Sequence, residues 1–470
     1  MTVGTESTAI RIRTISGERF TPLSLAKKLG ARALLESASF QRGRARYSFL
    51  LLKEAFRVSQ KGGDFFMTRD GITLALKTRA RDILDVTAHF SRQHDGAATP
   101  FPLPTGGVGY LSYEYCRHFD DIRLREKPDP LDIPDALFLF GSLFLVFDHY
   151  TDTISLVGVN YREKEIDLAR SLDETERRIE DMDFNFMAPP RKDWAVEKLG
   201  SPEDREGFLK GVESVRSEIV KGNLLQGVLS RRVRVRTDMP AIEAYRSLRM
   251  GNPSPYMFYL DFEDFQLFGA SPEVHVKARE GRAVIRPLAG TRRRGGTPAE
   301  DAALEKELLA DEKERAEHLM LVDLARNDLG RVCSPGSIEV TELMEVERYS
   351  HVMHIVSNVE GRLAEGKTGL DALRATFPAG TVSGAPKIRA IEVIDALEPE
   401  KRGFYAGVVA HVESDGSLDS CITIRSGLKK GDLLTLQAGA GIVYDSVPDR
   451  EYEETEAKLG ALARAIGMEV

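Results

Sequence analysis

Apolar residues recur at helical spacing in two strongly charged segments, one near residue 320 and one close to the C-terminal end. The first is capped by Asp311 and carries an apolar stripe formed by Leu319, Val322 and Ala325. The second is expected to open at Ser446 and Pro448. Its buried side is expected to consist of Tyr452, Leu459, Leu462 and Ile466. Both segments are therefore predicted to be amphipathic helices.

Alternating and continuously apolar runs predict several strands. We expect strands at residues 227–235, 256–268, 274–278, 406–413, 421–426 and 433–438. The apolar run 136–147 is broken by Gly141 and Ser142 and is too short to cross a bilayer, which takes about 20 residues. It is interpreted as one or two buried strands.

Further helices are marked by their caps. Ser201-Pro-Glu-Asp starts a helix whose stripe is Phe208, Val212, Val215 and Ile219 and which Gly222 ends. Thr297-Pro-Ala-Glu is a capping box for a helix through Leu304 and Leu308. The segment 181–199 contains a Pro-Pro step and reads as a connector between two halves. Strands interspersed with helices, several of them antiparallel, predict a mixed α and β fold.

The length and the net charge of the chain limit the classes of partner that it can bind. At 470 residues the chain exceeds the size of a single core, about 250–300 residues, so two domains or one composite core are expected. A net charge of −8 and a pI near 5.8 argue against nucleic acid or an anionic membrane as the main partner. The basic clusters Arg231/Arg232 and 292–294 are available for a small acidic substrate.

Cysteine usage and the N-terminus predict a cytoplasmic protein. Cys116, Cys333 and Cys421 lie far apart and form no CxxC pair, which is typical of a reducing compartment and gives no zinc site. The N-terminal residues lack a basic stretch followed by an apolar core, so no secretory signal is expected.

Two pairs of glutamates are the main candidates for chemistry. Glu314/Glu317 and Glu451/Glu454 each have i,i+3 spacing on a predicted helix, so the members of a pair share a face. Four such carboxylates can converge on a hard cation such as Mg²⁺. The same spacing is also common on solvated helix faces, and Lys458 is equally an ordinary ion-pair partner for Glu454.

Eight motifs carry a family resemblance. They are NPSPYMFYL, GASPE, RPLAGTRRRG, DEKERAEHLMLVDLARNDLGRV, YSHVMHIVSNVEG, ATFPAGTVSGAPKIRAIEVI, CITIRS and AGAGIVYDSVPDREYEET. In this order they resemble the chorismate-utilising enzymes, and most closely the large subunits of anthranilate synthase. The match runs from Ser201 to the C-terminus, with a shorter match near the N-terminus.

The resemblance implies a fold and an activity. The fold would be two packed antiparallel sheets with helices outside and a site in the cleft between them. Residues 1–190 would form an N-terminal region interleaved with a catalytic region, 200–470. The activity would be the Mg²⁺-dependent conversion of chorismate and ammonia to anthranilate and pyruvate, the first committed step of tryptophan biosynthesis.

The resemblance also implies roles for individual residues. Glu317 and Glu454 would bind Mg²⁺ directly, and Glu314 and Glu451 would hold metal-bound waters. Arg425, placed on an alternating strand, and Tyr405 would bind the enolpyruvyl carboxylate, since a guanidinium can bind a carboxylate through two hydrogen bonds. The remaining substrate contacts would be Gly290, Thr291, Thr381, Gly439, Gly441 and Lys458.

Two further residues resemble the groups that act on the ring. Glu273 in GASPE would protonate the departing 4-hydroxyl, provided that its surroundings keep it neutral. His354 would lie beside the ring and assist pyruvate elimination and aromatisation. By residue type alone, Glu273 reads as a strand-start residue and His354 as a core histidine.

Two positions separate the chain from related enzymes. Isochorismate and salicylate synthases carry a water-activating lysine where this chain has Gln226, which cannot act as that base. Aminodeoxychorismate synthases of the common type carry a nucleophilic lysine where this chain has Ala289. Direct addition of ammonia at C2 is the route that remains. Aminodeoxychorismate or isochorismate synthesis, and a non-catalytic ligand-binding relative, stay as alternatives.

The resemblance finally implies a partner and an inhibitor. No cysteine lies in a glutaminase-like motif, so ammonia would come through a channel from a separate glutamine amidotransferase subunit. Residues 34–37 and 252–258 resemble the segments of a feedback pocket for L-tryptophan. Its contacts would be Glu36, Ser37, Pro255, Tyr256, Met257 and Phe258.

Overall fold

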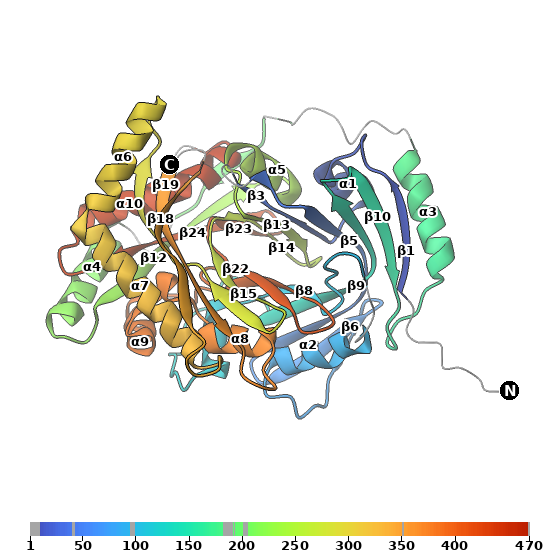
Figure 1. The fold of residues 1–470 in the computed structure, drawn as a ribbon, viewed down its shortest axis with the longest axis horizontal. Helices are drawn as coiled ribbons and strands as arrows, with labels where there is room; N and C mark the ends of the chain where they lie inside the picture. The colour runs from blue at the N-terminus through green and yellow to red at the C-terminus, as the bar shows by residue number, and fades with distance from the viewer. Residues whose placement is uncertain are drawn as a thin grey trace.

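The computed structural model describes residues 10–39, 43–94, 99–181, 191, 193–200, 205–349 and 352–468. Its main strands form one hydrogen-bonded network that divides into two sheets (Figure 1). Both sheets contain β5 (Tyr47–Lys61) and β9 (Ala136–Asp148), which pair along their length. Register shifts between Leu51 and Phe56 mark the point where these two strands pass from one sheet to the other.

Sheet one uses the N-terminal half of β5 and the C-terminal half of β9. Its antiparallel order is β1 (Ile10–Ser16), β10 (Thr153–Val159), β9, β5, β2 (Ala33–Glu36), β13 (Tyr256–Asp261), β14 (Gln266–Ser271), β23 (Ser426–Lys430), β24 (Leu433–Ile442), β12 (Gln226–Thr237) and β11 (Val196–Lys198). The short β20 (Gly384–Ala385) pairs with the start of β12.

Sheet two uses the opposite halves of β5 and β9. Its antiparallel order is β7 (Ile72–Ala75), β6 (Asp64–Arg69), β5, β9, β8 (Val108–Leu111), β21 (Val408–Val412), β22 (Leu418–Ile422), β15 (Val274–Arg279), β16 (Arg282–Ile285), β19 (Val352–Arg362) and β18 (Glu339–Arg348). β17 (Leu288–Arg293) follows β16 along β19, and β3 (Ala38–Ser39) and β4 (Gly43–Arg44) form a separate hairpin.

Alternation along the strands fixes the layers. On β13, Phe258 and Leu260 face the core between the sheets, whereas Met257 and Tyr259 face a second core beneath helices. Sheet one is covered by α1 (Pro22–Leu29), α3 (Leu168–Glu180), α5 (Ala241–Gly251) and α10 (Pro448–Ala465). Sheet two is covered by α2 (Ile83–Ser91), α7 (Glu312–Gly330) and α8 (Gly369–Thr376). The expected pair of packed antiparallel sheets with outer helices is confirmed.

The remaining helices lie at the sheet ends. α4 (Arg205–Val220) and α9 (Lys387–Leu397) pack over the paired ends of β12 and β24, and α6 (Pro298–Ala310) packs beside β17. Short 3-10 turns lie at Arg92–His94, Tyr113–His118 and Gly380–Val382. Among the residues described, no helix combines the length and apolar character needed to cross a membrane.

Most helix predictions are confirmed at their caps. Asp311 accepts hydrogen bonds from the backbone of Lys313 and Glu314, and Thr297 accepts one from Glu300. The predicted stripes of α4 and α10 are buried or half-buried. Two details are wrong. Leu319 is 47% exposed, whereas Val322 and Ala325 of the predicted stripe are buried together with Leu321. Val447, not Ser446, is the N-cap of α10.

Two predicted strands are each interrupted. Residues 256–268 form the hairpin of β13 and β14, turning at Glu263, which adopts a left-handed φ of 72°. The run 421–426 breaks after Ile422, and Arg425 lies between β22 and β23 with φ 51° rather than on a strand. The run 136–147 is one strand, β9. The expected start at Ser201 and most of the connector 181–199 lie outside the described residues, although β11 occupies the connector's end.

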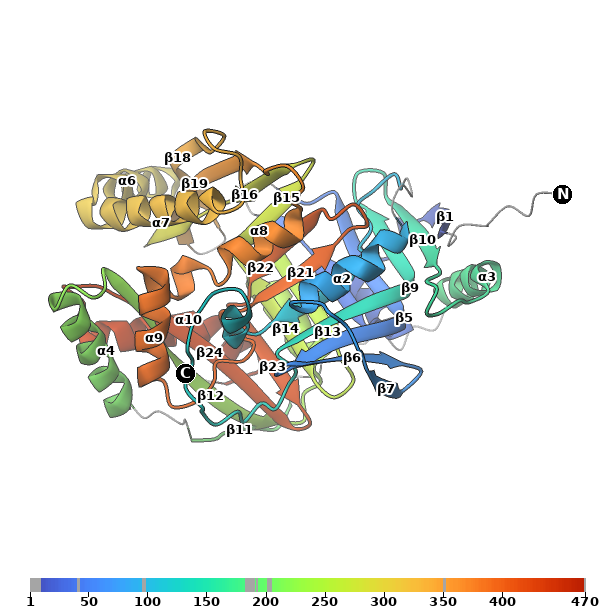
Figure 2. The same ribbon diagram turned by 90° about the horizontal axis from the view of Figure 1, so that it is seen from below.

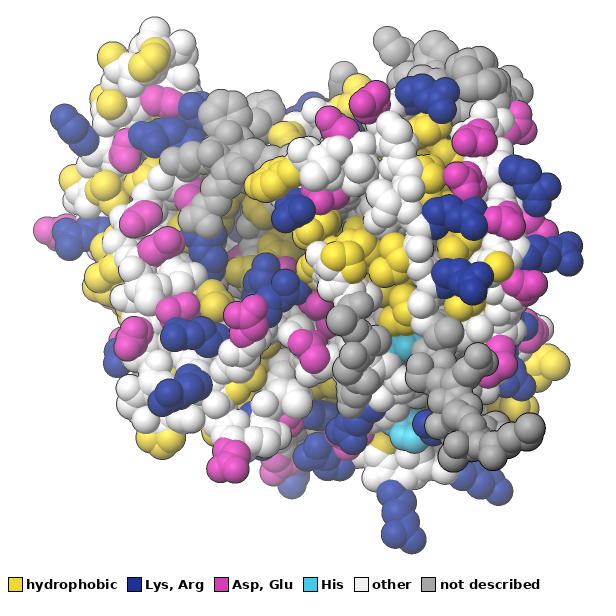
Figure 3. Space-filling view, turned by 45° about the vertical axis from the view of Figure 1, so that its right-hand side comes forward, with side chains coloured by type: hydrophobic (Ala, Val, Ile, Leu, Met, Phe, Trp, Pro, Cys, Tyr) yellow, Lys and Arg dark blue, Asp and Glu magenta, His cyan; other side chains and the backbone are white. Residues whose placement is uncertain are grey.

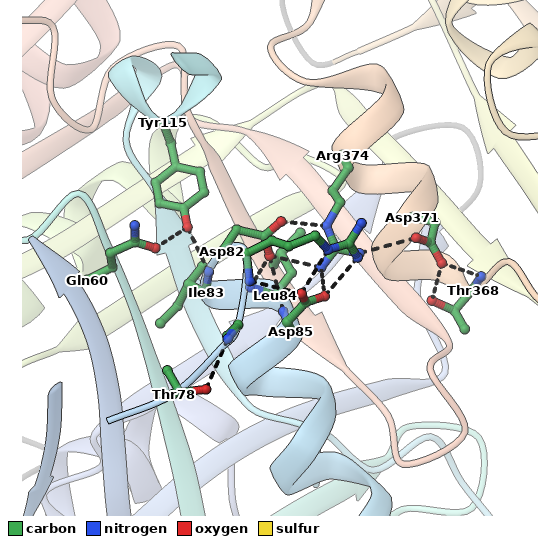
Figure 4. A network of polar contacts seen from close by, with 12 residues as sticks. Gln60, Thr78, Asp82, Ile83, Leu84, Asp85, Tyr115, Thr368, Asp371 and Arg374 are labelled. Carbon is green, nitrogen blue, oxygen red and sulfur yellow. Dashed lines mark hydrogen bonds and ion pairs between the residues drawn. The ribbon is translucent and has the colours of Figure 1, made fainter. Parts of the chain in front are cut away.

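A network of polar contacts locks α2 to α8 (Figure 4). Arg374 of α8 donates to both oxygens of Asp82, over 2.7 and 2.8 Å, and to Asp85 over 2.6 Å. Asp82 is also the N-cap of α2, where it accepts from the backbone of Leu84 and Asp85. Tyr115 accepts from the backbone of Ile83 and donates to Gln60 of β5. The start of α2 is thereby tied to both sheet two and α8.

We expect Arg374→Met to lower the free energy of unfolding by about 3 kcal/mol, because it leaves the buried Asp82 carboxylate without its cation. Arg81→Met is the matched control, since Arg81 pairs with Asp85 on the surface and its loss should cost less than about 1 kcal/mol. Denaturant unfolding of both variants checks this. Equal losses in the two variants would contradict the assigned role of Arg374.

Candidate functional site

The fold brings most of the predicted residues close to one another, on elements of both sheets. Sheet two contributes residues at the start of β15 and along β17 and β19, and sheet one contributes residues of β12 and β24. The helices α7 and α10 approach this region from the two layers (Figure 2). The residues concerned are Gln226, Glu273, Gly290, Thr291, His354, Thr381, Tyr405, Arg425, Gly439, Gly441 and Lys458.

Glu273 precedes β15 and is buried. Burial raises the pKa of its carboxyl group to about 8, although the Thr381 hydroxyl and the Lys458 ammonium oppose the shift. A cavity of about 30 Å³ lined by Glu273 and Thr381 lies beside the carboxyl group. Glu273 is therefore protonated near neutral pH and can donate a proton.

His354 on β19 is held in one orientation. Its Nδ1 lies 2.9 Å from the carbonyl oxygen of Gly290 and 3.1 Å from the hydroxyl of Thr291. Burial lowers the pKa of the imidazole to about 4, and the charges of Arg425 and Lys458 add to this effect. A neutral ring whose Nδ1–H donates to Gly290 leaves a lone pair on Nε2, which can accept a proton.

Arg425 and Tyr405, the residues expected to bind a carboxylate, are both buried and lie close to each other. Burial lowers the pKa of Arg425, while Tyr405 and Glu454 oppose that shift, which places both of them near the guanidinium. Burial raises the pKa of Tyr405 to about 12, so its hydroxyl remains a hydrogen-bond donor. Arg425 and Ala406 both have left-handed φ angles, 51° and 60°, which is strained backbone typical of functional sites.

Glycines on β24 leave room at the floor of the site. A Cβ at Gly439 would come within 2.8 Å of the Tyr405 hydroxyl, and a Cβ at Gly441 within 2.6 Å of Gln226 Nε2. The buried Oε1 of Gln226 has no hydrogen-bond partner among the described residues. A free buried acceptor of this kind is available to a small ligand that donates a hydrogen bond.

The carboxylates of α7 and α10 face each other across the site. Burial raises the pKa of Glu317 to about 7; Lys313 opposes this shift, whereas Glu314, Glu454 and Asp445 add to it. Glu454 pairs with Lys458 Nζ at 2.6 Å, and the same ammonium donates to the Gly439 carbonyl over 2.9 Å. Lys458 is therefore both an ion-pair partner of Glu454 and a hydrogen-bond donor to the backbone at the floor of the site.

This charge distribution fits Mg²⁺. Glu317 is a half-buried carboxylate with other acids around it, and a divalent cation would relieve that repulsion. Within the described residues, no three acidic, histidine or cysteine side chains are close enough to ligate one ion together. Two carboxylates, Glu317 and Glu454, with water and an anionic ligand would suit Mg²⁺. The two outer glutamates differ in their surroundings. Arg292 donates a hydrogen bond to Glu314 over 3.2 Å, whereas burial raises the pKa of Glu451.

Four of the five arginines in the basic clusters are already engaged by other side chains, whereas Arg293 is exposed. Arg292 pairs with Glu307, Asp311 and Glu314, and Arg294 pairs with Asp301. Arg232 pairs with Glu400 and bonds to Gln437, and Arg231 bonds to Thr455 and stacks on Tyr452. The expectation that these clusters are available to a substrate is wrong for the four engaged arginines, because a run of arginines does not reveal which side chains the fold places against it.

A buried ion pair behind the site was not anticipated. Arg402 binds Glu398 through 2.7 and 2.8 Å contacts and donates to the carbonyls of Val382, beside Thr381, and Val228 on β12. Its guanidinium lies 5.6 Å from the Tyr405 ring. The pair therefore connects three elements that carry site residues. Its i,i+4 spacing was the available signal, but that spacing usually marks a surface pair.

A second cavity, of about 650 Å³, lies between the sheets next to this site (Figure 3). Apolar side chains gather around a hollow on this face. The lining contains all six residues predicted for the feedback pocket, namely Glu36, Ser37, Pro255, Tyr256, Met257 and Phe258. The Glu36 side chain is fully enclosed, and its carboxylate is bound by Arg249 over 2.7 and 2.9 Å and by the Tyr245 hydroxyl.

The two cavities share a wall. Pro272 and Val274 line the large cavity, and Glu273 between them belongs to the first site. Tyr349 also lines the large cavity, and its ring lies 5.4 Å from the His354 ring. A ligand in the large cavity would therefore touch the immediate neighbours of both titratable groups.

Comparisons with known proteins identify the family of the chain. Residues 40–464 match the family model described as chorismate binding enzyme. Anthranilate synthase component 1 of Spirochaeta aurantia is 62% identical over 461 residues, covering 98% of this chain and 96% of that protein. The structure of anthranilate synthase component I from Streptococcus pneumoniae TIGR4 has a TM-score of 0.80 at 35% identity, covering 89% of this chain and 92% of that one.

A more distant structure shows the fold alone. The menaquinone-specific isochorismate synthase from Escherichia coli has a TM-score of 0.73 at 20% identity, covering 98% of this chain and 95% of that one. Shared architecture at this identity does not select a reaction, because one fold serves several activities. The choice depends on individual side chains.

Proposed function

Since the chain belongs to the chorismate-binding enzymes, we propose that it is the large subunit of an anthranilate synthase, which converts chorismate and ammonia to anthranilate and pyruvate. This is the first committed step of tryptophan biosynthesis. The observation that carries the proposal is the pairing of a neutral acid with a neutral base across one site. Burial keeps Glu273 protonated and His354 unprotonated at the same pH.

The two carboxylates of chorismate have matching partners. Arg425 and Tyr405 offer donors to the enolpyruvyl carboxylate, and Thr291, Lys458 and the open backbone at Gly439 surround the ring. Glu317 and Glu454 would hold Mg²⁺, with Glu314 and Glu451 positioned to hold its waters. Bound there, Mg²⁺ would neutralise the ring carboxylate and fix its position.

The residues then act on opposite parts of the ring. Glu273 donates its proton to the 4-hydroxyl, which leaves as water while ammonia forms a bond to C2. The added nitrogen loses its extra proton, which restores the proton that Glu273 gave up. His354 Nε2 removes the hydrogen at C2 as a proton and the bond between ring C3 and the enolpyruvyl oxygen breaks. The enolate released in this way takes up the proton held by His354 at its methylene carbon and becomes pyruvate. Loss of these groups makes the ring aromatic.

Two side chains select ammonia as the nucleophile. Gln226 lacks the basicity to activate water, and its free Oε1 can accept a hydrogen bond from ammonia. Ala289 lies on β17 opposite Ile355 and offers no nucleophile to the ring. Aminodeoxychorismate and isochorismate synthesis, and ligand binding without turnover, are the alternatives that product identification separates.

Ammonia must be supplied by a partner. Burial raises the pKa of the thiols of Cys116, Cys333 and Cys421, so none of them offers the thiolate that a glutaminase nucleophile requires. We therefore include a glutamine amidotransferase subunit, component II, in the proposal. Three free thiols also fit the reducing cytoplasm as the place of action.

The cavity of about 650 Å³ suits L-tryptophan as a feedback inhibitor. It is large enough for one amino acid and is lined by both apolar and charged side chains. Tryptophan held there would press on Pro272, Val274 and Tyr349, and so shift Glu273 and His354. Such coupling acts in both directions, since chorismate binding would weaken tryptophan binding equally.

Purified chain incubated with chorismate, Mg²⁺ and an ammonium salt should form anthranilate and pyruvate in equal amounts. Fluorescence and chromatography identify the products, and EDTA serves as the control because it removes the cation between Glu317 and Glu454. Glutamine should not replace ammonium in the absence of a partner. Aminodeoxychorismate or isochorismate as the product, or no turnover, would refute the proposal.

Ser37→Phe should abolish inhibition by L-tryptophan and leave the uninhibited rate unchanged. A phenyl ring at this position would fill part of the large cavity without reaching the substrate site. Anthranilate formation is measured against tryptophan concentration in both proteins. An inhibition curve identical to that of the parent would remove this cavity as the feedback site.

A further inference from the structure

Five large apolar side chains are exposed around the end of sheet one where β12 begins and β24 ends. They are Val220 at 69% exposure, Leu225 at 64%, Ile388 at 44%, Tyr444 at 68% and Val447 at 44%. We name these five residues the rim patch. Single exposed apolar residues are ordinary, but several that flank one end of a sheet are typical of an interaction surface.

Hydrogen bonds and an ion pair hold the segments around Val220, Leu225, Ile388 and Tyr444 together. The Leu225 N–H donates to the Ala385 carbonyl over 2.8 Å, and Ile388 follows on the first turn of α9. Arg389, next to Ile388, pairs at 3.3 Å with Glu218 of α4, the helix that ends at Val220. Arg216 of α4 donates to the Tyr444 carbonyl over 3.3 Å.

The rim patch borders the site directly. Leu225 precedes Gln226, and Gly227 pairs with Ile442, two residues before Tyr444. Gly441 pairs with Val228 in the same ladder. In Figure 2, α4, α9 and the ends of β12 and β24 lie together on one side of the molecule. A protein seated on the rim patch would therefore stand beside Gln226 and Gly441.

Charged residues frame the rim patch, and they are largely paired with one another. The pairs are Arg216–Glu213, Lys221–Glu218, Arg389–Glu392, Lys313–Asp445 and Arg205–Asp449. An apolar centre inside a polar frame is the usual anatomy of a surface that binds another protein. Paired charges leave no strong net field, which argues against an anionic polymer as the occupant.

We propose that the rim patch is the docking surface for the glutamine-hydrolysing subunit. This inference rests on the proposed function, in which ammonia must reach C2 of the ring. Ammonia released into water near neutral pH becomes ammonium, which is not a nucleophile. A subunit docked on the rim patch would release ammonia next to the free Gln226 Oε1. No cysteine of this chain is suited to generate it, since burial raises the pKa of all three thiols.

Other exposed apolar residues provide matched controls. Ile72 and Leu74 on β7 are 63% and 60% exposed, comparable to the rim patch. β7 is the edge strand of sheet two, at the opposite end of the strand order from β18 and β19. A charge introduced on β7 therefore tests whether any loss of exposed apolar surface weakens the complex, or only loss at the rim patch.

The test uses the full chain and the component II subunit from the same organism. Ile388→Asp and Tyr444→Asp should each raise the dissociation constant for that subunit by about tenfold or more, measured by titration calorimetry. Glutamine-dependent anthranilate formation should fall in parallel, whereas ammonium-dependent formation should stay unchanged. Leu74→Asp should change neither rate. Unchanged thermal midpoints show that the variants are folded.

The outcomes separate this inference from the function on which it rests. Unchanged affinity in both rim variants would overturn the docking surface and leave the proposed function intact. Light scattering could instead show that the chain forms a dimer and that Ile388→Asp disrupts this dimer without changing the affinity for component II. That result would assign the rim patch to a second copy of the chain and would also overturn the docking surface. No ammonium-dependent product from the parent chain would overturn the proposed function itself.

Discussion

Desolvation between the two sheets is the constraint on which the site depends. Removing water from a titratable group favours its neutral form, so one environment raises the pKa of Glu273 and lowers those of His354 and Arg425. An acid and a base can then be present in their reactive forms at the same pH. Exposure to solvent would return the pKa values of both groups to their ordinary 4.5 and 6.5, so that Glu273 would be ionised at neutral pH and could no longer act as the acid.

Two long strands and a buried ion pair keep the site enclosed between the sheets. β5 and β9 run through both sheets and hold them face to face, and the Glu398–Arg402 pair fixes β12, the turn at Thr381 and Tyr405 relative to one another. Buried ion pairs add little net stability, but they specify one arrangement. The strand β15 then separates two cavities, so that occupation of the larger one can reach Glu273 through Pro272 and Val274.

Local rules predicted much of the fold, and motifs predicted the site. The caps at Asp311 and Thr297 and the long strand at 136–147 follow from nearby residues alone. The prediction that Leu319 is buried is wrong. Helix periodicity shows which residues share a face, but it does not show which neighbouring element covers that face. The strand expected at Arg425 is wrong, since β22 ends at Ile422 and Arg425 has a left-handed φ of 51° that a run of alternating residues does not reveal. The arginine clusters and the Glu398–Arg402 pair depend on acids and carbonyls that only the folded chain brings near.

The protonation state of Glu273 tests the central claim most directly. Infrared difference spectra between the parent chain and Glu273→Gln, recorded across neutral and alkaline pH, isolate the signal of this one carboxyl group. We expect the band of a neutral carboxylic acid at pH 7, lost as the pH rises through about 8, together with the activity that depends on it. A carboxylate signal already at pH 7 would contradict the account.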